Sequence, residues 1–420
     1  MNIEDYAKSL KKQHNGQSYA FLAERVPESA DAPYRFAPIS EPIKPNAPII
    51  IAFGGSGDGA NIIGHNWFIK HITNFIRSYP QLNGARVCVA VCDFGKKYND
   101  NIARDAYNIQ KDTPKVWNFL DKVVKHPITK MDPENYNPRA ARDIFNAVIL
   151  PKITDKYGFR LSTNQMLQNI RGITIIAYCS GGHTAMYLEH EMVAQMGKYG
   201  YRQNEIKTAL NQIAVIGSHL TCPYDKSNMR FFNFHSVSDV GHMNSFQEFL
   251  YMSQARFDIM HIAKNNSDTF YCNRMSKDEY LNGERIIRVI PVEDFMGKMD
   301  EQNSEDHVES PTDMFGEHDF IGFVEKDDFS NGAKDLQTLF KTIIVNTAEN
   351  SIKNAHGNKF VPLPATEDLV GDKLDILGRA NVAFIREETI YIPSALSWQL
   401  IYQQKQIANL HSIRKWLKSR

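Results

Sequence analysis

The sequence lacks the marks of several protein classes. Its 420 residues include only five cysteines, an odd number that argues against a disulfide framework and favours a reducing compartment. Cys88 and Cys92 form a close pair but have no second pair nearby, so we expect no metal site. Lysine plus arginine and aspartate plus glutamate both number 48, and a chain without excess positive charge does not indicate nucleic acid as a partner.

Long apolar segments are also missing. No stretch approaches the roughly 18 apolar residues of a membrane-spanning helix. The polar segment 1–18 contains no apolar core of a signal peptide. These absences predict a cytoplasmic protein, and they leave open export by a route that needs no cleavable signal.

What the sequence contains is an ordinary globular composition, 42% hydrophobic and 23% charged. Short apolar runs that end in turn signals alternate with amphipathic segments of helix length. This alternation predicts an α/β fold, a mostly parallel sheet with helices on both faces. The expected strands are Pro48–Phe53, Val87–Cys92, Ile173–Ala177, Ile213–Ile216, Phe231–His235 and Arg285–Val292, and the expected helices include Asn66–Ser78, His183–Lys198 and Ser245–Lys264.

We expect three parts along the chain: an N-terminal extension over 1–44, a catalytic α/β domain over 45–330, and a mostly helical C-terminal region over 331–420. Within the domain, segment 293–328 carries 13 acidic residues against two lysines, a net charge of −11, which suggests a solvated loop or lid. The last helix, expected from residue 393, carries five basic residues and no acidic one. It is either a docked terminal helix or a basic face for peripheral membrane contact.

The segment I-T-I-I-A-Y-C-S-G-G-H carries the strongest chemical signal. The expected strand Ile173–Ala177 runs into a tight turn, and a helical pattern follows from Gly182. A nucleophile elbow needs this context, because the nucleophile sits on a strained strand-to-helix turn at the edge of a sheet. Residues two before and two after the nucleophile must be small, since strand and helix backbones nearly touch there.

Two nucleophiles compete in this turn. With Cys179 the flanking residues are Ala177 and Gly181, which are both small. With Ser180 the flanking residues are Tyr178 and Gly182, and a tyrosine at the crowded position is a steric objection. We therefore favour Cys179, whose thiolate a helix amino end would stabilise, and keep Ser180 as the alternative.

The A-Y-C-S-G-G turn resembles the lipase-type box of the α/β-hydrolase superfamily, and its cysteine form is similar to the box of polyhydroxyalkanoate synthases. With Ser180 as nucleophile, it is similar to the G-x-S-x-G of bacterial phospholipase effectors that lack a classical signal. The resemblance covers about residues 45–330. It implies an α/β-hydrolase-like fold, a Cys (or Ser)-His-Asp triad and no cofactor.

The family's order of nucleophile, acid and histidine assigns the other partners. Asp239 follows the expected strand Phe231–His235, and His318 lies in M-F-G-E-H-D-F-I-G-F, which resembles the family's histidine turn. The resemblance also makes the turn after Pro48–Phe53 half of an oxyanion hole. Asp239 has an alternative role as a helix cap. The residues expected to bind the oxyanion or the substrate are Gly54, Gly55, Ser56, Gly181 and His183, and His219 is expected at the same edge.

The sequence therefore predicts a hydrolase or acyltransferase of esterase, lipase or thioesterase type, acting on a small acyl or lipid substrate through a covalent acyl-enzyme. Two alternatives remain. The pattern Gly55-x-Gly57-x-x-Ala60 also fits a nucleotide-binding oxidoreductase, although Asp93, which ends the next strand, lies 33 residues after Ala60 instead of about 20. The other alternative is a non-catalytic interaction protein built on a hydrolase scaffold.

Overall fold

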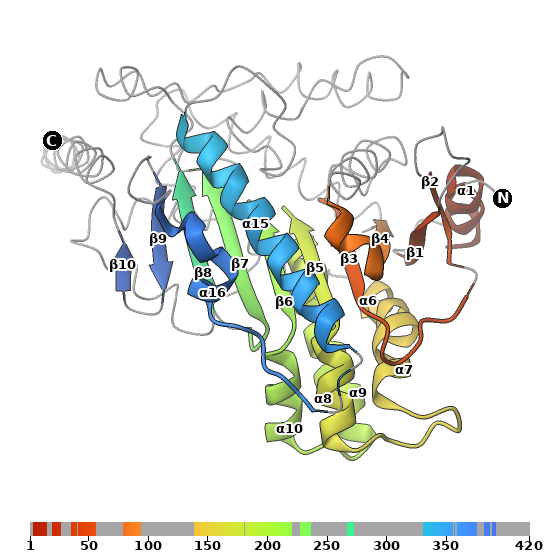
Figure 1. Cartoon of the computed structure of the whole chain (residues 1–420). Helices are drawn as coiled ribbons and strands as arrows, with labels where there is room; N and C mark the ends of the chain where they lie inside the picture. Colours follow the sequence, from red (N-terminus) through yellow and green to blue (C-terminus); the bar gives the residue numbers. More distant parts are fainter. Residues whose placement is uncertain are drawn as a thin grey trace, which may run out of the picture.

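A mixed sheet of ten strands runs through the part of the chain that the structure describes (Figure 1). The computed structural model describes residues 3–14, 19–26, 35–39, 41–55, 79–93, 138–179, 181–220, 227–236, 267–272, 331–355, 357, 359–375, 382–386 and 389–391. The strands follow the spatial order β10-β9-β8-β7-β6-β5-β3-β4-β1-β2.

The middle of the sheet is parallel and its borders are antiparallel. All pairs from β4 through β3, β5, β6 and β7 to β8 are parallel. The β1–β4, β1–β2, β8–β9 and β9–β10 pairs are antiparallel. The strands are β1 (Tyr19–Val26), β2 (Arg35–Pro38), β3 (Ile49–Phe53), β4 (Arg86–Asp93), β5 (Ile173–Tyr178), β6 (Ala214–Ser218), β7 (Arg230–Ser236), β8 (Ser267–Cys272), β9 (Val382–Arg386) and β10 (Thr389–Tyr391).

Five expected strands are confirmed as β3, β4, β5, β6 and β7, with ends shifted by one or two residues. The sixth, Arg285–Val292, lies outside the described residues. β8 was not expected, because the first three residues of its sequence S-D-T-F-Y-C are polar and the strand forms no continuous apolar run. The structure thus confirms the α/β class with a mostly parallel centre.

The sheet extends beyond segment 45–330 on both sides. β1 and β2 come from the first 44 residues, and β9 and β10 come from the region expected to be mostly helical. An ion pair joins the first of these strands to the sheet: Arg86 on β4 donates to Glu24 on β1 at 2.5 and 2.6 Å. The borders at 44/45 and 330/331 therefore do not coincide with borders of the sheet.

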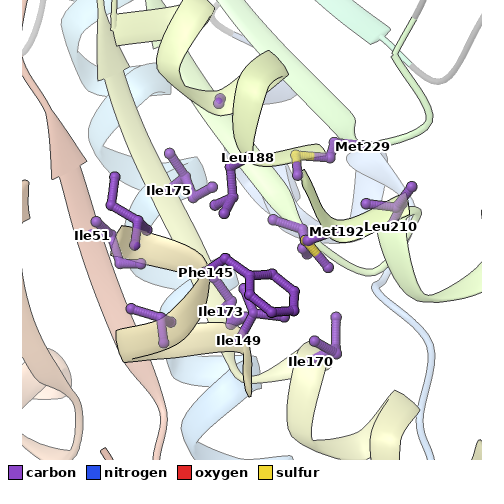
Figure 2. Packing of buried hydrophobic residues seen from close by; sticks show 14 of the residues in the cluster. Ile51, Phe145, Ile149, Ile170, Ile173, Ile175, Leu188, Met192, Leu210 and Met229 are labelled. Atoms are coloured by element: carbon purple, nitrogen blue, oxygen red, sulfur yellow. The ribbon is translucent and has the colours of Figure 1, made fainter. Parts of the chain in front are cut away.

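Helices cover both faces. One face is packed against several helices from the middle of the chain, and Figure 2 shows the apolar side chains between them. The labelled side chains come from the strands (Ile51, Ile173, Ile175), from the helices (Phe145, Ile149, Ile170, Leu188, Met192, Leu210) and from the residue before β7 (Met229). The elements on this face are α6 (Pro138–Ile144), the π-helical segment Phe145–Ile149, α7 (Leu150–Ile153), α8 (Thr163–Arg171), α9 (Gly181–Lys198) and α10 (Gln203–Leu210).

On the other face, the longest helix in the described ranges is α15 (Asn331–Asn354), which crosses the sheet in Figure 1. Leu339, Phe340, Ile343 and Ile344 of α15 are buried against the sheet. The prediction of a helix after residue 331 is confirmed for this segment. The other described helices are α1 (Ile3–His14), η1 (Pro80–Gly84), α16 (Thr366–Val370) and η6 (Gly371–Asp375).

β5 contributes side chains to the apolar layers on both faces of the sheet. Side chains alternate between the two faces of a strand. Ile173, Ile175 and Ala177 therefore join the layer under α9, whereas Ile176 and Tyr178 join the layer under α15. A strand buried on both faces needs a continuous apolar run, which is why β5 was predictable. Its carboxyl end carries the turn that was predicted to be a nucleophile elbow.

Candidate active site

The turn between β5 and α9 places Cys179 in a left-handed conformation, with φ of 50°. For a residue with a side chain, this conformation costs about 1–2 kcal/mol relative to the right-handed region. Two hydrogen bonds hold the turn: the Cys179 N–H donates to the Ser218 carbonyl at 3.0 Å, and the Cys179 carbonyl accepts from Gly182 N–H at 3.2 Å. The thiol is free and half-buried.

The start of α9 lies unusually close to the end of β3. A Cβ atom at Gly181 would lie 2.3 Å from the Phe53 carbonyl oxygen and 3.0 Å from the Gly54 oxygen. No side chain fits at such distances, so only glycine allows this approach. The position two after Cys179 therefore meets the size requirement that the sequence predicted for it.

The loop after β3 lies against the same turn. A Cβ atom at Gly55 would lie 3.1 Å from Cys179 Cβ and 3.2 Å from a ring carbon of Tyr178. Gly54 and Gly55 are both buried. The structure thus brings together four of the predicted site residues, namely Gly54, Gly55, Cys179 and Gly181.

This meeting point has a topological cause. β4, the next strand in the chain, pairs with one edge of β3, and β5 pairs with the opposite edge of β3. In open α/β sheets, ligands bind at such a switch point, beyond the carboxyl ends of the strands. Gly54 follows β3 and Cys179 follows β5, so both lie where the fold alone would place a ligand.

Two histidines were expected at this edge. His183 lies in the first turn of α9 and is 4% exposed. His219 follows β6, is fully buried and has φ of 51°. The backbone N–H of His219 donates to the Phe234 carbonyl at 3.0 Å. The carbonyl of the preceding residue, Ser218, accepts from the backbone N–H of Cys179.

Cys179 and His219 thus lie at the ends of adjacent parallel strands, where Cys179 N–H bonds to the carbonyl of Ser218, the residue before His219. Among the described residues, they are the two non-glycine residues with positive φ. The sequence signal for His219 was its place in G-S-H after an apolar run. Nothing in that signal indicated the backbone conformation.

The chain also turns sharply after β6. A Cβ atom at Gly217 would lie 2.3 Å from Leu220 Cδ1 and 3.0 Å from Asn233 Oδ1. Leu220 therefore folds back onto the last residues of β6. This close packing and the bond to Phe234 hold His219 in its left-handed conformation.

Cys88 provides a contrast within the same chain. It lies on β4, is fully buried and is also a free thiol. Burial raises its pKa to about 12. A thiol of this kind is inert at neutral pH, whereas Cys179 is only half-buried and lies at the carboxyl edge of the sheet.

Four predicted site residues lie outside the described residues: Ser56, Ser180, Asp239 and His318. The acidic segment 293–328 and the basic segment 393–420 also lie wholly outside them. Their roles therefore stay predictions. In the described ranges, no three His, Cys, Asp or Glu side chains gather in a group that could hold a metal ion.

Comparison with known proteins adds no family name. The sequence matches no protein-family model and no curated protein. A membrane-crossing helix is not found either: none of the helices in the described ranges combines the necessary length and apolar character.

Proposed function

We propose that this chain is an α/β-hydrolase-like enzyme that transfers or hydrolyses acyl groups with Cys179 as nucleophile. The observation that carries the proposal is the left-handed Cys179 on a strand-to-helix turn, with Gly181 packed against the Phe53 carbonyl. A nucleophile elbow has this geometry, because the strained turn exposes the reactive atom at the sheet edge. The same geometry favours Cys179 over Ser180, since the residue two after Cys179 makes the close contact.

The first half-reaction would start with transfer of the Cys179 thiol proton to His318, and the thiolate would then attack the acyl carbon of an ester or thioester. The new C–S bond forms while the carbonyl oxygen becomes an oxyanion. Backbone N–H groups of the Gly54–Gly55 loop and of Ser180 would stabilise this oxygen, as in the oxyanion hole of hydrolases. The positive end of the α9 dipole favours the same negative charge.

Collapse of the intermediate breaks the bond to the leaving group, which departs with a proton from His318. In the second half-reaction, His318 takes a proton from water or from an acceptor alcohol, which attacks the thioester and regenerates the thiolate. Asp239 would orient the His318 ring and stabilise the imidazolium. Hydrolysis and acyl transfer differ only in the attacking group.

Covalent labelling tests the nucleophile. The full chain is treated with a fluorophosphonate, which reports an activated serine, and with a thiol-reactive ester analogue, followed by peptide mapping. We expect stoichiometric labelling at Cys179 and none at the buried Cys88 in the same protein. Labelling should be lost in Cys179→Ala and strongly slowed in His318→Ala.

Matched controls separate chemistry from folding. His190 is an exposed residue of α9, and His190→Ala should label like the wild type. Labelling at Ser180 instead of Cys179 would retain the enzyme class and reject the cysteine mechanism. If neither residue reacts in folded protein, the acyl-transfer proposal fails.

One observation favours a second candidate, a nucleotide-binding oxidoreductase. β3 and β4 are adjacent and parallel, the glycine loop follows β3, and β4 ends at Asp93. A dinucleotide-binding unit uses this arrangement, with the acid contacting a ribose hydroxyl. A rise in the unfolding temperature on addition of a nicotinamide or flavin nucleotide, combined with an unreactive elbow, would favour this candidate.

A further inference from the structure

Arg171 is a buried cation at the opposite end of β5 from Cys179. It is the last residue of α8, and its side chain is 2% exposed. β5 has six residues, so the two sites are separated by about 20 Å at about 3.3 Å per residue. Whatever surrounds Arg171 therefore has no direct contact with the candidate nucleophile.

The guanidinium of Arg171 is only partly satisfied. Its Nη1 donates to the Ser351 hydroxyl of α15 at 2.7 Å. That hydroxyl is also within 3.1 Å of the Arg171 carbonyl oxygen and 3.0 Å of the Thr347 carbonyl oxygen. The N–H groups on Nε and Nη2 are buried and have no acceptor among the described residues.

Two more buried donors lie in the same layer. The Thr174 hydroxyl, on β5, and the Thr347 hydroxyl, one turn before Ser351 on α15, are fully buried and find no hydrogen-bond partner in the described parts of the chain. Thr174 alternates with Ile173 and Ile175 and so shares the strand face of Ile176, which α15 covers. Because α15 packs on β5 and Ser351 binds Arg171, Arg171, Thr174 and Thr347 belong to the layer between β5 and the last turns of α15.

Within the described ranges, no carboxylate pairs with Arg171. Arg230 is its charged neighbour, and burial together with this second cation lowers the pKa of Arg171 to about 10. Arg171 therefore stays protonated at neutral pH. The carboxylate of Asp268 is already engaged by Arg230 at 3.6 Å and by the Thr366 hydroxyl.

A buried charge with neither a counter-ion nor a full set of hydrogen bonds is strongly unfavourable. A water molecule would satisfy some of the donors but would leave the charge unbalanced. We infer that Arg171, Thr174 and Thr347 form a binding site for a small monovalent anion of chloride size, held between the sheet and α15. The anion accepts hydrogen bonds from the guanidinium and from both hydroxyls, and it ties the C-terminal helix to the start of β5.

Thermal unfolding of the full chain tests this inference. Sodium chloride or bromide is titrated against sodium gluconate at constant ionic strength, so that general screening cancels. We expect the halides to raise the unfolding midpoint by several degrees in a saturable manner, because an anion that binds only the folded state stabilises it. Equal midpoints in halide and gluconate would overturn the inference.

Variants locate the effect. Thr174→Val and Thr347→Val remove the hydroxyl donors without changing size or charge, and together they should abolish most of the halide response. Thr208→Val is the matched control, because the Thr208 hydroxyl donates to the Asn204 carbonyl at 2.8 Å on α10. An unchanged response in the double variant would reject these residues as the site.

Crystals grown or soaked in bromide give a direct readout. An anomalous peak within hydrogen-bond distance of Arg171 Nε is expected, and a water molecule there instead would overturn the inference. The result is independent of the proposed enzyme activity, since Cys179→Ala should keep the full halide response. Failure of the labelling experiment would therefore leave the anion site untouched, and the reverse also holds.

Discussion

Lys152 should make the stability of this protein depend on pH in a defined direction. Its side chain is fully buried, and its Nζ donates to the carbonyls of Pro45 at 2.9 Å and Ala47 at 2.7 Å. Burial lowers the pKa of Lys152 from 10.5 to about 7. A neutral amine has two N–H groups, which match these two carbonyls and fix the chain just before β3.

The sign follows from proton binding in the two states. Between pH 7 and 10.5 the unfolded chain holds a proton on Lys152 and the folded chain does not, so the free energy of unfolding rises with pH in this window. Below pH 7 both states are protonated and the contribution of Lys152 is constant. The full difference corresponds to about 5 kcal/mol, at about 1.4 kcal/mol per pKa unit.

Lys152→Met removes the titrating group and keeps the length of the side chain. Urea unfolding at pH 7, 8, 9 and 10 gives the stability of the wild type minus that of the variant. This difference should grow by about 1.4 kcal/mol per pH unit, because groups common to both proteins cancel. Cys88 and Tyr201, whose pKa values burial raises to about 12, are among those groups.

The exposed Lys156 provides the control, and the Lys156→Met profile should run parallel to the wild type. A difference between wild type and Lys152→Met that stays constant from pH 7 to 10 would refute the reasoning. It would mean that Lys152 remains charged when folded, with the two carbonyls stabilising the cation.

Three further predictions follow from the same structure. Gly181→Ala should lower the free energy of unfolding by about 1–3 kcal/mol through overpacking and should slow the labelling of Cys179. In the control Gly197→Ala, the new methyl group meets nothing within 4 Å, so this variant should be neutral or slightly stabilising. Urea unfolding and labelling rates check both variants. The free energy of unfolding of Cys179→Gly should exceed that of Cys179→Ala by about 1 kcal/mol, since glycine adopts the left-handed conformation without strain. Equal free energies of unfolding would show that the backbone at position 179 is not strained. Asp268→Asn should cost about 3 kcal/mol in urea unfolding, because it removes the negative charge that lies 3.6 Å from the guanidinium of the largely buried Arg230.

The parallel centre of the sheet was predictable because strands buried on both faces need continuous apolar runs. β3 and β5, which carry the site loops, have such runs, and every residue in them is buried. The border strands were not predictable in the same way. β1 contains Glu24, whose charge is paired with Arg86, 62 residues further on.

The predicted site depended on local rules about residue size and turn position. The requirement for small residues around a nucleophile favours Cys179 over Ser180 from the sequence alone, and the contact between Gly181 and Phe53 is the physical reason for that requirement. Lys152 and Arg171 show the limit of such rules. A charged residue is expected at the surface, and its burial depends on partners such as Ala47 and Ser351 that lie far away in the sequence.

The two left-handed residues at the sheet edge bear on function through their chemical identity. Glycine would adopt φ near 50° at no steric cost, so a side chain at such a position costs about 1–2 kcal/mol for each residue. The chain carries this cost at Cys179 and again at His219, at the ends of adjacent strands whose backbones share a hydrogen bond. Strain of this kind clusters at functional sites, where the surrounding structure enforces it. A strained thiol at the end of a central strand is the nucleophile that the proposed acyl transfer needs, which supports the proposed function independently of the glycine contacts.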